Sequence, residues 1–371
     1  MKHGRLINIA LLLFTISLLP ACHIARYFYF NVADVNDFKK FPQSEIKKGS
    51  TVFEFISTDN KVDIPLPSHL KENGTISFTQ FIEEHKTLSF IIIRNDSILY
   101  ENYFDGYDEA SVLPSFSASK VFISALTGIS IDKGKIKSVN DSMTTYLPML
   151  HGKGLEKINI EHLLDMRSGI DFDEGYRTPF SEMAKYYYGL DLKKYIEDIR
   201  LKQAPGLAYD YVSVNSQLIA MAIENAWGKP FPEIVEEEIW QPLGMEFDAS
   251  WNLDSHKHET VKAFCCLNAR ARDFAKLGRL YLHHGDWQGK QILSNAWIEK
   301  SLKIHNDSRD SQGFSYSYQW RVLESGAYFA KGILGQFIYV DPAKNIIIVR
   351  MGKSSDDIRW PDFFVELCKA L

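Results

Sequence analysis

A serine and a lysine three residues apart carry the clearest chemical signal in this chain. They lie in the stretch 114–120, PSFSASK, which runs on into the apolar residues of 121–126. If this run is a helix, Ser117 and Lys120 lie one turn apart on the same face, so an amine lies beside a hydroxyl. These two residue types in this spacing indicate a nucleophile and its base.

The pattern Ser-x-x-Lys is a weak signal by itself, because it occurs four times, at Ser44, Ser68, Ser117 and Ser130. The first two lie in polar segments without helical periodicity, and the last lies where a helix runs out. Only Ser117 opens an apolar helical run, where free backbone N–H groups collect at a helix N-terminus. Taken alone, the pattern also fits an ordinary N-cap serine followed by a solvated lysine.

Two further elements could complete such a site. A turn at Pro205 and Gly206 places Tyr211 just before a predicted helix, and a tyrosine beside a lysine can act as a general base. The stretch 330–337, AKGILGQF, puts small residues on a terminal strand, where main-chain N–H groups can face a developing oxyanion. Each has a structural alternative: Tyr211 can be a core aromatic residue, and the glycine-rich strand can be a bulge or a tight sheet crossing.

Composition excludes several other kinds of protein. The 371 residues carry a net charge of -5 and no dense block of Lys and Arg, which argues against nucleic acid as the main partner. No CxxC, HExxH or clustered His and Asp pattern indicates a metal site, and we expect no cofactor. No Gly-x-Ser-x-Gly is present and no histidine has a recognisable context, which disfavours a Ser-His-Asp hydrolase.

The first 22 residues differ in character from the rest. Lys2 and Arg5 precede a mostly apolar stretch, 6–19, that ends in Pro-Ala-Cys at Cys22. This stretch is short for a membrane span and is typical of an export signal, with a signal-anchor helix as the alternative. It resembles the lipobox of bacterial lipoproteins, so Cys22 is expected to carry a lipid and attach the protein to a membrane. The residue directly after Cys22 is His23 and not Asp. By resemblance to bacterial lipoproteins, this implies that the protein is attached to the outer membrane, on its periplasmic side, and is not retained at the inner membrane.

The other cysteines are Cys265, Cys266 and Cys368. Adjacent cysteines are badly placed to bond each other, so we expect no disulfide. All three are predicted to be small buried apolar groups.

The elements that must position the candidate residues form strands at both ends of the chain. Two β-rich runs around Asn95 and Asp96 predict a hairpin over 89–104. Residues 135–290 are predicted to be mainly helical, with helices at 160–167, 191–199, 216–226, 231–240 and 271–283. Further strands are predicted at 318–323, 327–330, 337–340 and 346–351, before a closing helix at 362–371. This order excludes a regular βαβ alternation.

These elements, in this order and spacing, resemble the serine β-lactamase and penicillin-binding protein family, in its class C and esterase branch. Several stretches look most like the 6-aminohexanoate-dimer hydrolases, among them 163–169 (LLDMRSG), 241–245 (QPLGM) and 335–342 (GQFIYVDP). The resemblance implies an α/β fold of the α+β type. An antiparallel sheet from both chain ends would be flanked by helices, with a mainly helical region inserted. Residues 1–22 would be the lipoprotein signal peptide, 23–75 a tether and packing segment, and 76–371 the hydrolase domain.

The resemblance also implies roles for single residues. Ser117 would be the acylated nucleophile, Lys120 its proton partner and Tyr211 the tyrosine of a Tyr-x-Asn element. Gly332 falls on the glycine of a Lys-Thr-Gly element. The backbone N–H groups of Ser117 and Ile333 would form the oxyanion hole.

Two departures from the family pattern bear on substrate binding. Ser213 stands where the family has Asn, and Asn215 is expected to substitute for it near the substrate. Ala330 stands where the family has the lysine that grips a carboxylate, and Lys331 is expected on the other face of its strand.

Tyr176, in the loop 171–187, and Trp320 are further candidates for substrate contact, and either could instead lie in the core. With the resemblance, these residues indicate a serine hydrolase that forms an acyl-enzyme on amide or ester bonds of a small molecule or short peptide. One alternative is a β-lactamase or D-Ala-D-Ala carboxypeptidase, disfavoured by the missing lysine. Another is a non-catalytic lipid-anchored receptor for a cell-wall ligand. Substrate and oligomeric state stay open.

Overall fold

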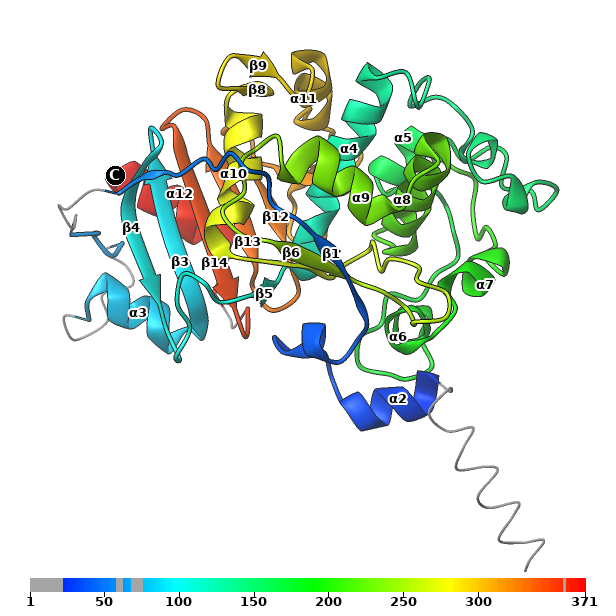
Figure 1. Cartoon of the computed structure of the whole chain (residues 1–371), viewed down its shortest axis with the longest axis horizontal. Helices are drawn as coiled ribbons and strands as arrows, with labels where there is room; N and C mark the ends of the chain where they lie inside the picture. The colour runs from blue at the N-terminus through cyan, green and yellow to red at the C-terminus, as the bar shows by residue number, and fades with distance from the viewer. Residues whose placement is uncertain (1–22, 58–62, 68–75, 356–357) are drawn as a thin grey trace, which may run out of the picture.

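The computed structural model describes residues 23–57, 63–67, 76–355 and 358–371. An eight-stranded sheet forms one half of the molecule, with the strand order β10-β11-β12-β13-β14-β3-β4-β2 (Figure 1). All neighbours pair antiparallel except β2 with β4. The strands are β2 (Ile56–Ser57), β3 (Thr87–Arg94), β4 (Ser97–Tyr103), β10 (Ser315–Ser317), β11 (Trp320–Val322), β12 (Tyr328–Lys331), β13 (Phe337–Asp341) and β14 (Ile346–Gly352).

The two ends of the chain meet at the centre of this sheet. Strand β14 pairs with β3 along their whole length, with Ile348 opposite Ile92. Alternate residues of β3 point to opposite faces: Ile91 and Ile93 join one hydrophobic core, and Phe90 and Ile92 join the other. The predicted sheet from both chain ends is therefore confirmed.

Helices cover both faces of the sheet. Helix α10 (Ala271–Leu282) packs on β13, β14 and β3, while α3 (Phe78–Glu84) and α12 (Trp360–Ala370) pack on the opposite face. Gly278 of α10 lies so close to the sheet that a Cβ atom there would be 3.2 Å from Val340 and Ile347. The small residue thus lets helix and sheet approach closely.

The mainly helical region lies beside the sheet, on the right of Figure 1. Helix α8 packs against both α4 and α5 and forms its centre. The helices of this region are α4 (Lys120–Asp132), α5 (Ile160–Leu164), α6 (Glu182–Tyr188), α7 (Leu192–Glu197), α8 (Val214–Trp227), α9 (Phe231–Val235) and α11 (Asn295–Ser301). The predicted helical middle is confirmed, and the predicted helices agree with observed ones to within a few residues at their ends, except that 231–240 is divided into α9 and a π-helix at Glu236–Trp240. Helices α6 and α11 were not predicted.

A smaller sheet joins the two halves, with the order β1-β6-β7-β5. Strand β5 (Leu113–Pro114) pairs with β7 (Leu267–Ala269), and β1 (Gln43–Ile46) pairs with β6 (Ala249–Asn252). Through this sheet, the residues that follow β5 lie beside those that precede β7. A separate small hairpin consists of β8 (Asp286–Trp287) and β9 (Lys290–Gln291).

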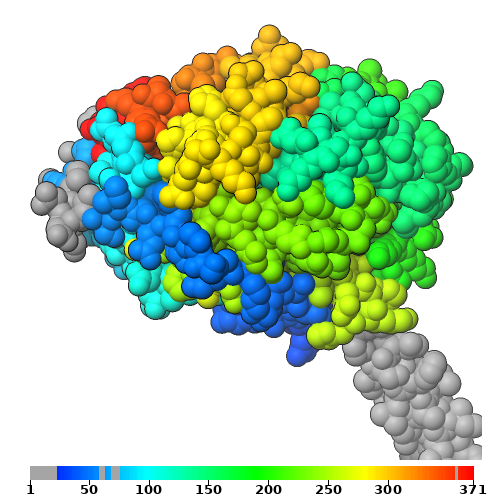
Figure 2. Space-filling view, turned by 45° about the horizontal axis from the view of Figure 1, so that its top comes forward, coloured from blue at the N-terminus to red at the C-terminus, as the bar shows by residue number. Residues whose placement is uncertain are grey.

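The described N-terminal residues lie on the surface of the folded body, where Figure 2 shows them in blue. Helix α2 (His23–Phe30) packs against α6, and the Tyr187 hydroxyl donates to Asp37 at 2.6 Å. Cys22 and the predicted export segment 1–22 lie outside the described residues. None of the helices in the described part of the chain is long and apolar enough to cross a membrane.

Candidate active site

Ser117 lies in a tight turn between a strand and a helix. The Ser115 N–H donates to Leu267 O at 2.9 Å, which fixes the end of β5 against β7. The chain then forms a 3-10 turn, Phe116–Ser119, that leads into α4. Phe116 has φ +44°, a conformation that side chains other than glycine adopt at a cost of roughly 1–3 kcal/mol. Such strain is concentrated at functional sites, and here it aims the next residue, Ser117.

Lys120 is almost completely buried, with 1% of its surface exposed. Its Nζ donates to Ser117 Oγ at 3.1 Å and to Ser213 Oγ at 3.4 Å, and a third hydrogen bond goes to Phe264 O. These acceptors account for all three protons of an ammonium group. The structure therefore brings together the serine and lysine that the sequence paired, and it holds the lysine in one position.

A carboxylate that the sequence did not single out lies behind this pair. Glu174 accepts hydrogen bonds from the Ser213 N–H, at 2.7 Å, and from the Ser213 and Tyr176 hydroxyls. Burial raises the pKa of Glu174, and the nearby charge of Lys120 partly opposes this rise. Burial, followed by the charge of Glu174, raises the pKa of Tyr176, so its hydroxyl stays protonated. Side chains therefore connect Glu174 to Ser117 through Ser213 and Lys120.

Tyr211 lies beside this chain of hydrogen bonds. The Nζ of Lys120 is 5.3 Å from the centre of its ring, and the ring packs edge-on against Tyr316 at 6.0 Å. Arg321 lies against the same ring at 5.6 Å. The structure thus places Tyr211 next to Lys120, at the edge of a cavity that Ser117 also lines.

The end of β12 approaches the Ser117 turn closely. A Cβ atom on Gly332 would lie 2.6 Å from Ser115 O, which is too close for any other residue without a shift of the backbone. Gly332 N donates to Gln336 O at 2.8 Å, which closes the turn. Ile333 lines two cavities together with Ser117. The glycine is therefore needed for the contact between strand and turn.

Two cavities meet at Ser117, Tyr176 and Ile333. One, of 350 Å³, has mainly apolar walls: Val32, Ala33, Phe116, Met183, Phe264 and Leu334 are among them. We call it the acyl-side cavity. The other, of 460 Å³, is lined by charged and polar residues that include Glu174, Tyr211, Asp310, Arg321 and Lys331. We call it the polar cavity. Sites of this size and form commonly hold small molecules.

Two predicted substrate-binding residues lie elsewhere. Asn215 is completely buried, where it accepts from the Ser168 hydroxyl at 2.7 Å and donates to Met166 Sδ at 3.4 Å. Trp320 is also fully buried and packs on Tyr281 at 4.8 Å. Neither residue lines the acyl-side or the polar cavity. Ser213, and not Asn215, contacts Lys120.

The other predicted positions lie at the cavities. Tyr176, which is 40% exposed, and Ile333 line both cavities, and Gly332 lines the polar one. Ala330 is 1% exposed and packs in the larger core, while Lys331 lies on the other side of β12, as strand alternation requires. Its side chain lines the polar cavity.

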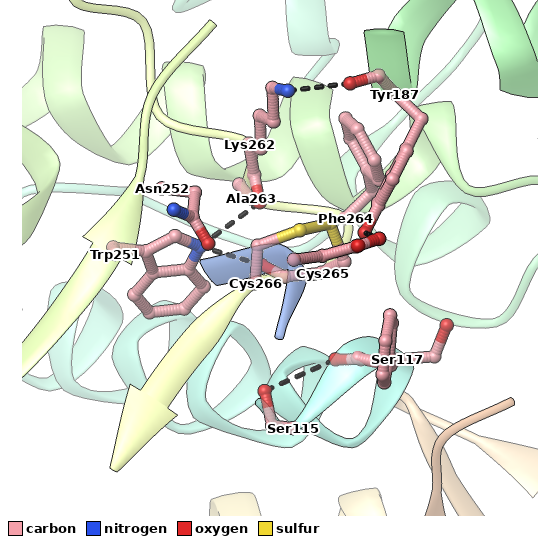
Figure 3. Close-up of a disulfide and its surroundings, with 12 residues drawn as sticks. Ser115, Ser117, Tyr187, Trp251, Asn252, Lys262, Ala263, Phe264, Cys265 and Cys266 are labelled. Atoms are coloured by element: carbon pink, nitrogen blue, oxygen red, sulfur yellow. Dashed lines mark hydrogen bonds between the residues drawn. A yellow bond between two sulfur atoms is a disulfide. The ribbon is translucent and has the colours of Figure 1, made fainter. Parts of the chain in front are cut away.

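The prediction that Cys265 and Cys266 do not bond each other is wrong. The structure joins them in a disulfide, with their Cα atoms 3.7 Å apart (Figure 3). The chain turns sharply here, because Cys266 has φ +77°, and the turn brings the neighbouring side chains to the same side. Cys265 lines the acyl-side cavity, and Phe264, whose carbonyl binds Lys120, directly precedes it. Cys368 is buried and free, as expected.

Among the residues that the structure describes, no group of three or more His, Cys, Asp or Glu is arranged to hold a metal ion. The carboxylates near Ser117 have other contacts. Asp310 pairs with Arg321 at 2.7 Å, and Asp210 pairs with Lys202 at 2.5 Å. The chemistry available at this site includes that of a serine, a lysine, a tyrosine and a partly buried carboxylate.

Known proteins share this architecture. A solved structure from Bacillus anthracis, provisionally named as a 6-aminohexanoate-dimer hydrolase, superimposes with a TM-score of 0.80 at 23% identity. It covers 88% of this chain and 90% of that one. The 6-aminohexanoate-dimer hydrolase of Paenarthrobacter ureafaciens is 28% identical over 308 residues, 76% of this chain and 75% of that protein. The D-alanyl-D-alanine-carboxypeptidase/endopeptidase AmpH of Escherichia coli (strain K12) is 24% identical over 172 residues, 43% of this chain and 44% of that protein.

A family model described as Beta-lactamase matches residues 78–358, which is well over half of the chain. The match includes both strands of the N-terminal hairpin, the Ser117 turn, the helical region and the C-terminal strands. These matches confirm the resemblance seen in the sequence. This chain belongs to the β-lactamase family and is a serine hydrolase.

Proposed function

We propose that this protein hydrolyses an amide or ester bond through an acyl-enzyme on Ser117. The observation that carries the proposal is the 3.1 Å hydrogen bond between buried Lys120 and Ser117, at the point where two cavities meet. A serine hydroxyl becomes a useful nucleophile when a neighbouring base removes its proton. Lys120 acts as that base when it is neutral, with its lone pair in place of the N–H that points at Ser117.

The reaction has two steps. Ser117 Oγ bonds to the carbonyl carbon as its proton passes to Lys120. Tyr211 then gives its hydroxyl proton to the leaving atom as the C–N or C–O bond breaks, and Lys120 returns a proton to Tyr211. Water then attacks the acyl group on Ser117 and releases it as the acid. The backbone N–H groups of Ser117 and Ile333 bind the oxyanion in both steps, a contribution of roughly a hundredfold or more for each donor.

The test compares two serines that begin Ser-x-x-Lys patterns. Ser117→Ala is expected to lose all but about 0.1% of ester hydrolysis and all labelling by a fluorophosphonate probe. Ser44→Ala, which changes a serine in β1, serves as the control and should keep both. Undiminished hydrolysis by Ser117→Ala would reject the proposal.

Lactam antibiotics and cell-wall peptides are the second candidate substrates, supported by the relative named as a D-alanyl-D-alanine-carboxypeptidase. Buried Ala330 stands at the position of the carboxylate-gripping lysine, which favours other amides and esters. Hydrolysis of a chromogenic cephalosporin faster than that of simple esters would reverse this order. A protein with no labelling at Ser117 but tight binding of a cell-wall fragment would instead be a receptor.

We further propose that the protein is an exported lipoprotein whose Cys22 carries the lipid, on the periplasmic side of the outer membrane. The apolar stretch 6–19 before Cys22 supports this proposal. A fatty-acid label fed to a bacterial host should attach to the wild-type protein and not to Cys22→Ser. Absence of label on the wild type would reject the lipid anchor.

A further inference from the structure

The position of Tyr211 assigns a direction to the proposed reaction. In acyl transfer the leaving atom takes up a proton, so the group that supplies the proton must lie within hydrogen-bond reach of that atom. Tyr211 lines the polar cavity and does not line the acyl-side cavity. The leaving group therefore departs into the polar cavity, and the acyl group occupies the acyl-side cavity.

The walls of the acyl-side cavity favour an apolar acyl group. They come from separate parts of the chain, which include the N-terminal segment at Val32 and Ala33, helix α6 with the loop before it, and the turn at Phe264 and Cys265. Each methylene group that leaves water for such a surface contributes about 0.8 kcal/mol. A volume of 350 Å³ accommodates a medium-length chain or a ring.

The charges of the polar cavity are balanced except at one lysine. Asp310 pairs with Arg321, and Glu174 is bound by Ser213 and Tyr176. Lys331 Nζ instead contacts the neutral side-chain oxygen of Gln312, at 3.3 Å, and forms no ion pair within the described parts of the chain.

The surroundings of Lys331 act on the pKa of its amine. Burial, and then the neighbouring charge of Arg321, lower the pKa of its amine. The charge of Asp310 opposes these effects in part, and an anion bound beside Lys331 would oppose them further, because an opposite charge at short range favours the ammonium form. The polar cavity thus contains a lysine that, in the described parts of the chain, has no ion-pair partner of its own.

We propose that the substrate is an amphiphile with an apolar acyl group and a leaving group that carries a carboxylate. N-acyl amino acids and acyl esters of hydroxy acids have this form. Lys331 binds the carboxylate in the polar cavity while the acyl chain fills the acyl-side cavity. The C–N or C–O bond between the two parts then lies at Ser117, where the two cavities meet. This inference rests on the proposed acyl-enzyme function and names its substrate class.

The experiment uses a panel of phenyl esters with the full-length protein. Octanoyl and acetyl esters of para-hydroxybenzoate are anionic, and those of its methyl ester are neutral. A charge-assisted hydrogen bond makes the anionic octanoyl ester the better substrate by about tenfold in kcat/KM. Lys331→Met should reduce this ratio to about one. Lys331→Glu should instead prefer an octanoyl ester with a trimethylammonium group on the leaving phenol.

Matched controls separate charge and chain length from general damage. Lys290→Met, which removes an exposed lysine in the β8–β9 hairpin, should keep the anionic preference. Val32 is 51% exposed, so Val32→Asp can fold, and it should reduce the octanoyl-to-acetyl ratio about tenfold. Ile56→Asp, at a residue 60% exposed in β2, should leave that ratio unchanged.

The outcomes distinguish the two proposals. If no ester is hydrolysed in a Ser117-dependent manner, the acyl-enzyme function and the substrate class both fail. If the wild type hydrolyses the esters through Ser117 without preference for charge or chain length, only the substrate class fails. A charge preference that Lys331→Met retains would also overturn the assignment of Lys331.

Discussion

Ser213 connects a partly buried carboxylate to the candidate nucleophile. Its hydroxyl donates to Glu174 and accepts from Lys120, and a serine can do both at once. The charge of Glu174 thereby acts on Lys120 through one shared neighbour. We interpret Glu174 as a positioning residue, since it contacts Ser213 and Tyr176 and lies two hydrogen bonds further from Ser117 than Lys120 does.

Glu174→Gln should lower kcat by about tenfold or more and change KM little, because an amide has one acceptor oxygen where the carboxylate has two, and the hydrogen bonds that fix Ser213 beside Lys120 are weakened. Burial raises the pKa of Glu174, so this carboxylate takes up its proton at a higher pH than an ordinary glutamate. In the wild type, kcat/KM should therefore fall on the acid side as Glu174 is protonated, and the Gln variant should lack this step. A pH profile of kcat/KM for ester hydrolysis, recorded for the wild type and for Glu174→Gln, measures this difference. Glu182→Gln, at an exposed residue of the same region, should retain the wild-type profile.

The sequence could predict the local part of this site and not the part that depends on distant contacts. Ser117 and Lys120 are one turn apart on a helix, so their contact follows from spacing. Glu174 lies in an acidic Asp-Glu-Gly-Tyr loop that is typical of a solvated surface. Its partner Ser213 comes 39 residues later, and only the folded chain brings the two together. Asn215 was favoured over Ser213 by its amide, but its position on α8 buries it against Ser168.

At the scale of elements, a hairpin turn joins the sheet to the helical region. Tyr318 and Gln319 form the turn between β10 and β11, both with positive φ, of 42° and 73°. The Gln319 side chain donates to the carbonyl oxygens of Leu163 and Leu164 at the end of α5. The sequence predicted one strand over 318–323, since Tyr and Gln lack the turn preference that Asn and Gly show. By contrast, Asn95 and Asp96 have that preference, and the β3–β4 hairpin was predicted correctly.

Asp165, which follows α5, accepts from the Tyr318 N–H at 2.9 Å and makes stability depend on pH. Burial raises the pKa of this carboxyl from 3.8 to about 7. Between these values the folded protein binds the proton more tightly than the unfolded chain does. The free energy of unfolding should therefore fall as pH rises from about 4 to about 7, by up to about 1.4 kcal/mol per unit.

Asp165→Asn keeps an oxygen for the Tyr318 N–H and removes the titration. The variant should lose this pH dependence and be more stable than the wild type at pH values above about 7. Urea unfolding at mildly acidic and mildly alkaline pH measures the difference. The change Asp171→Asn, at an exposed residue nearby, is the control and should leave the wild-type dependence intact. A wild-type stability that rises across this window would contradict the interpretation.

At the scale of the whole molecule, the described N-terminal segment is part of the catalytic body. Strand β1 extends the small sheet that contains β5, and β2 extends the edge of the large sheet. Val32 and Ala33 contribute to the wall of the acyl-side cavity. The strands near the two chain ends could be predicted, because they follow from runs of apolar residues. The docking of this segment could not be predicted, because it depends on contacts with residues far away along the chain, such as Tyr187, which lies 150 positions after Asp37.

Asp34 and Asp37 both pair with Lys40, and variants of the two aspartates test how the N-terminal segment is held on the folded body. Asp37 is 4% exposed, accepts from the Tyr187 hydroxyl at 2.6 Å and pairs with Lys40 at 2.6 Å. Asp34 pairs with the same lysine at 2.8 Å, and its side chain is 48% exposed. Asp37→Ala leaves a buried hydroxyl without its acceptor and should lower the free energy of unfolding by about 2 kcal/mol. Asp34→Ala breaks an exposed ion pair and should cost less than about 1 kcal/mol.

The same pair of variants reports on the cavity wall, since Val32 and Ala33 precede Asp37 by only a few residues. If contact with Tyr187 holds this segment in place, Asp37→Ala should also lose part of the octanoyl-to-acetyl preference in ester hydrolysis, while Asp34→Ala retains it. Unfolding in urea and hydrolysis of the two esters measure the two effects on the same samples. Equal losses of stability for both variants would mean that the ion pairs with Lys40, and not the hydrogen bond to Tyr187, fix the segment on the body.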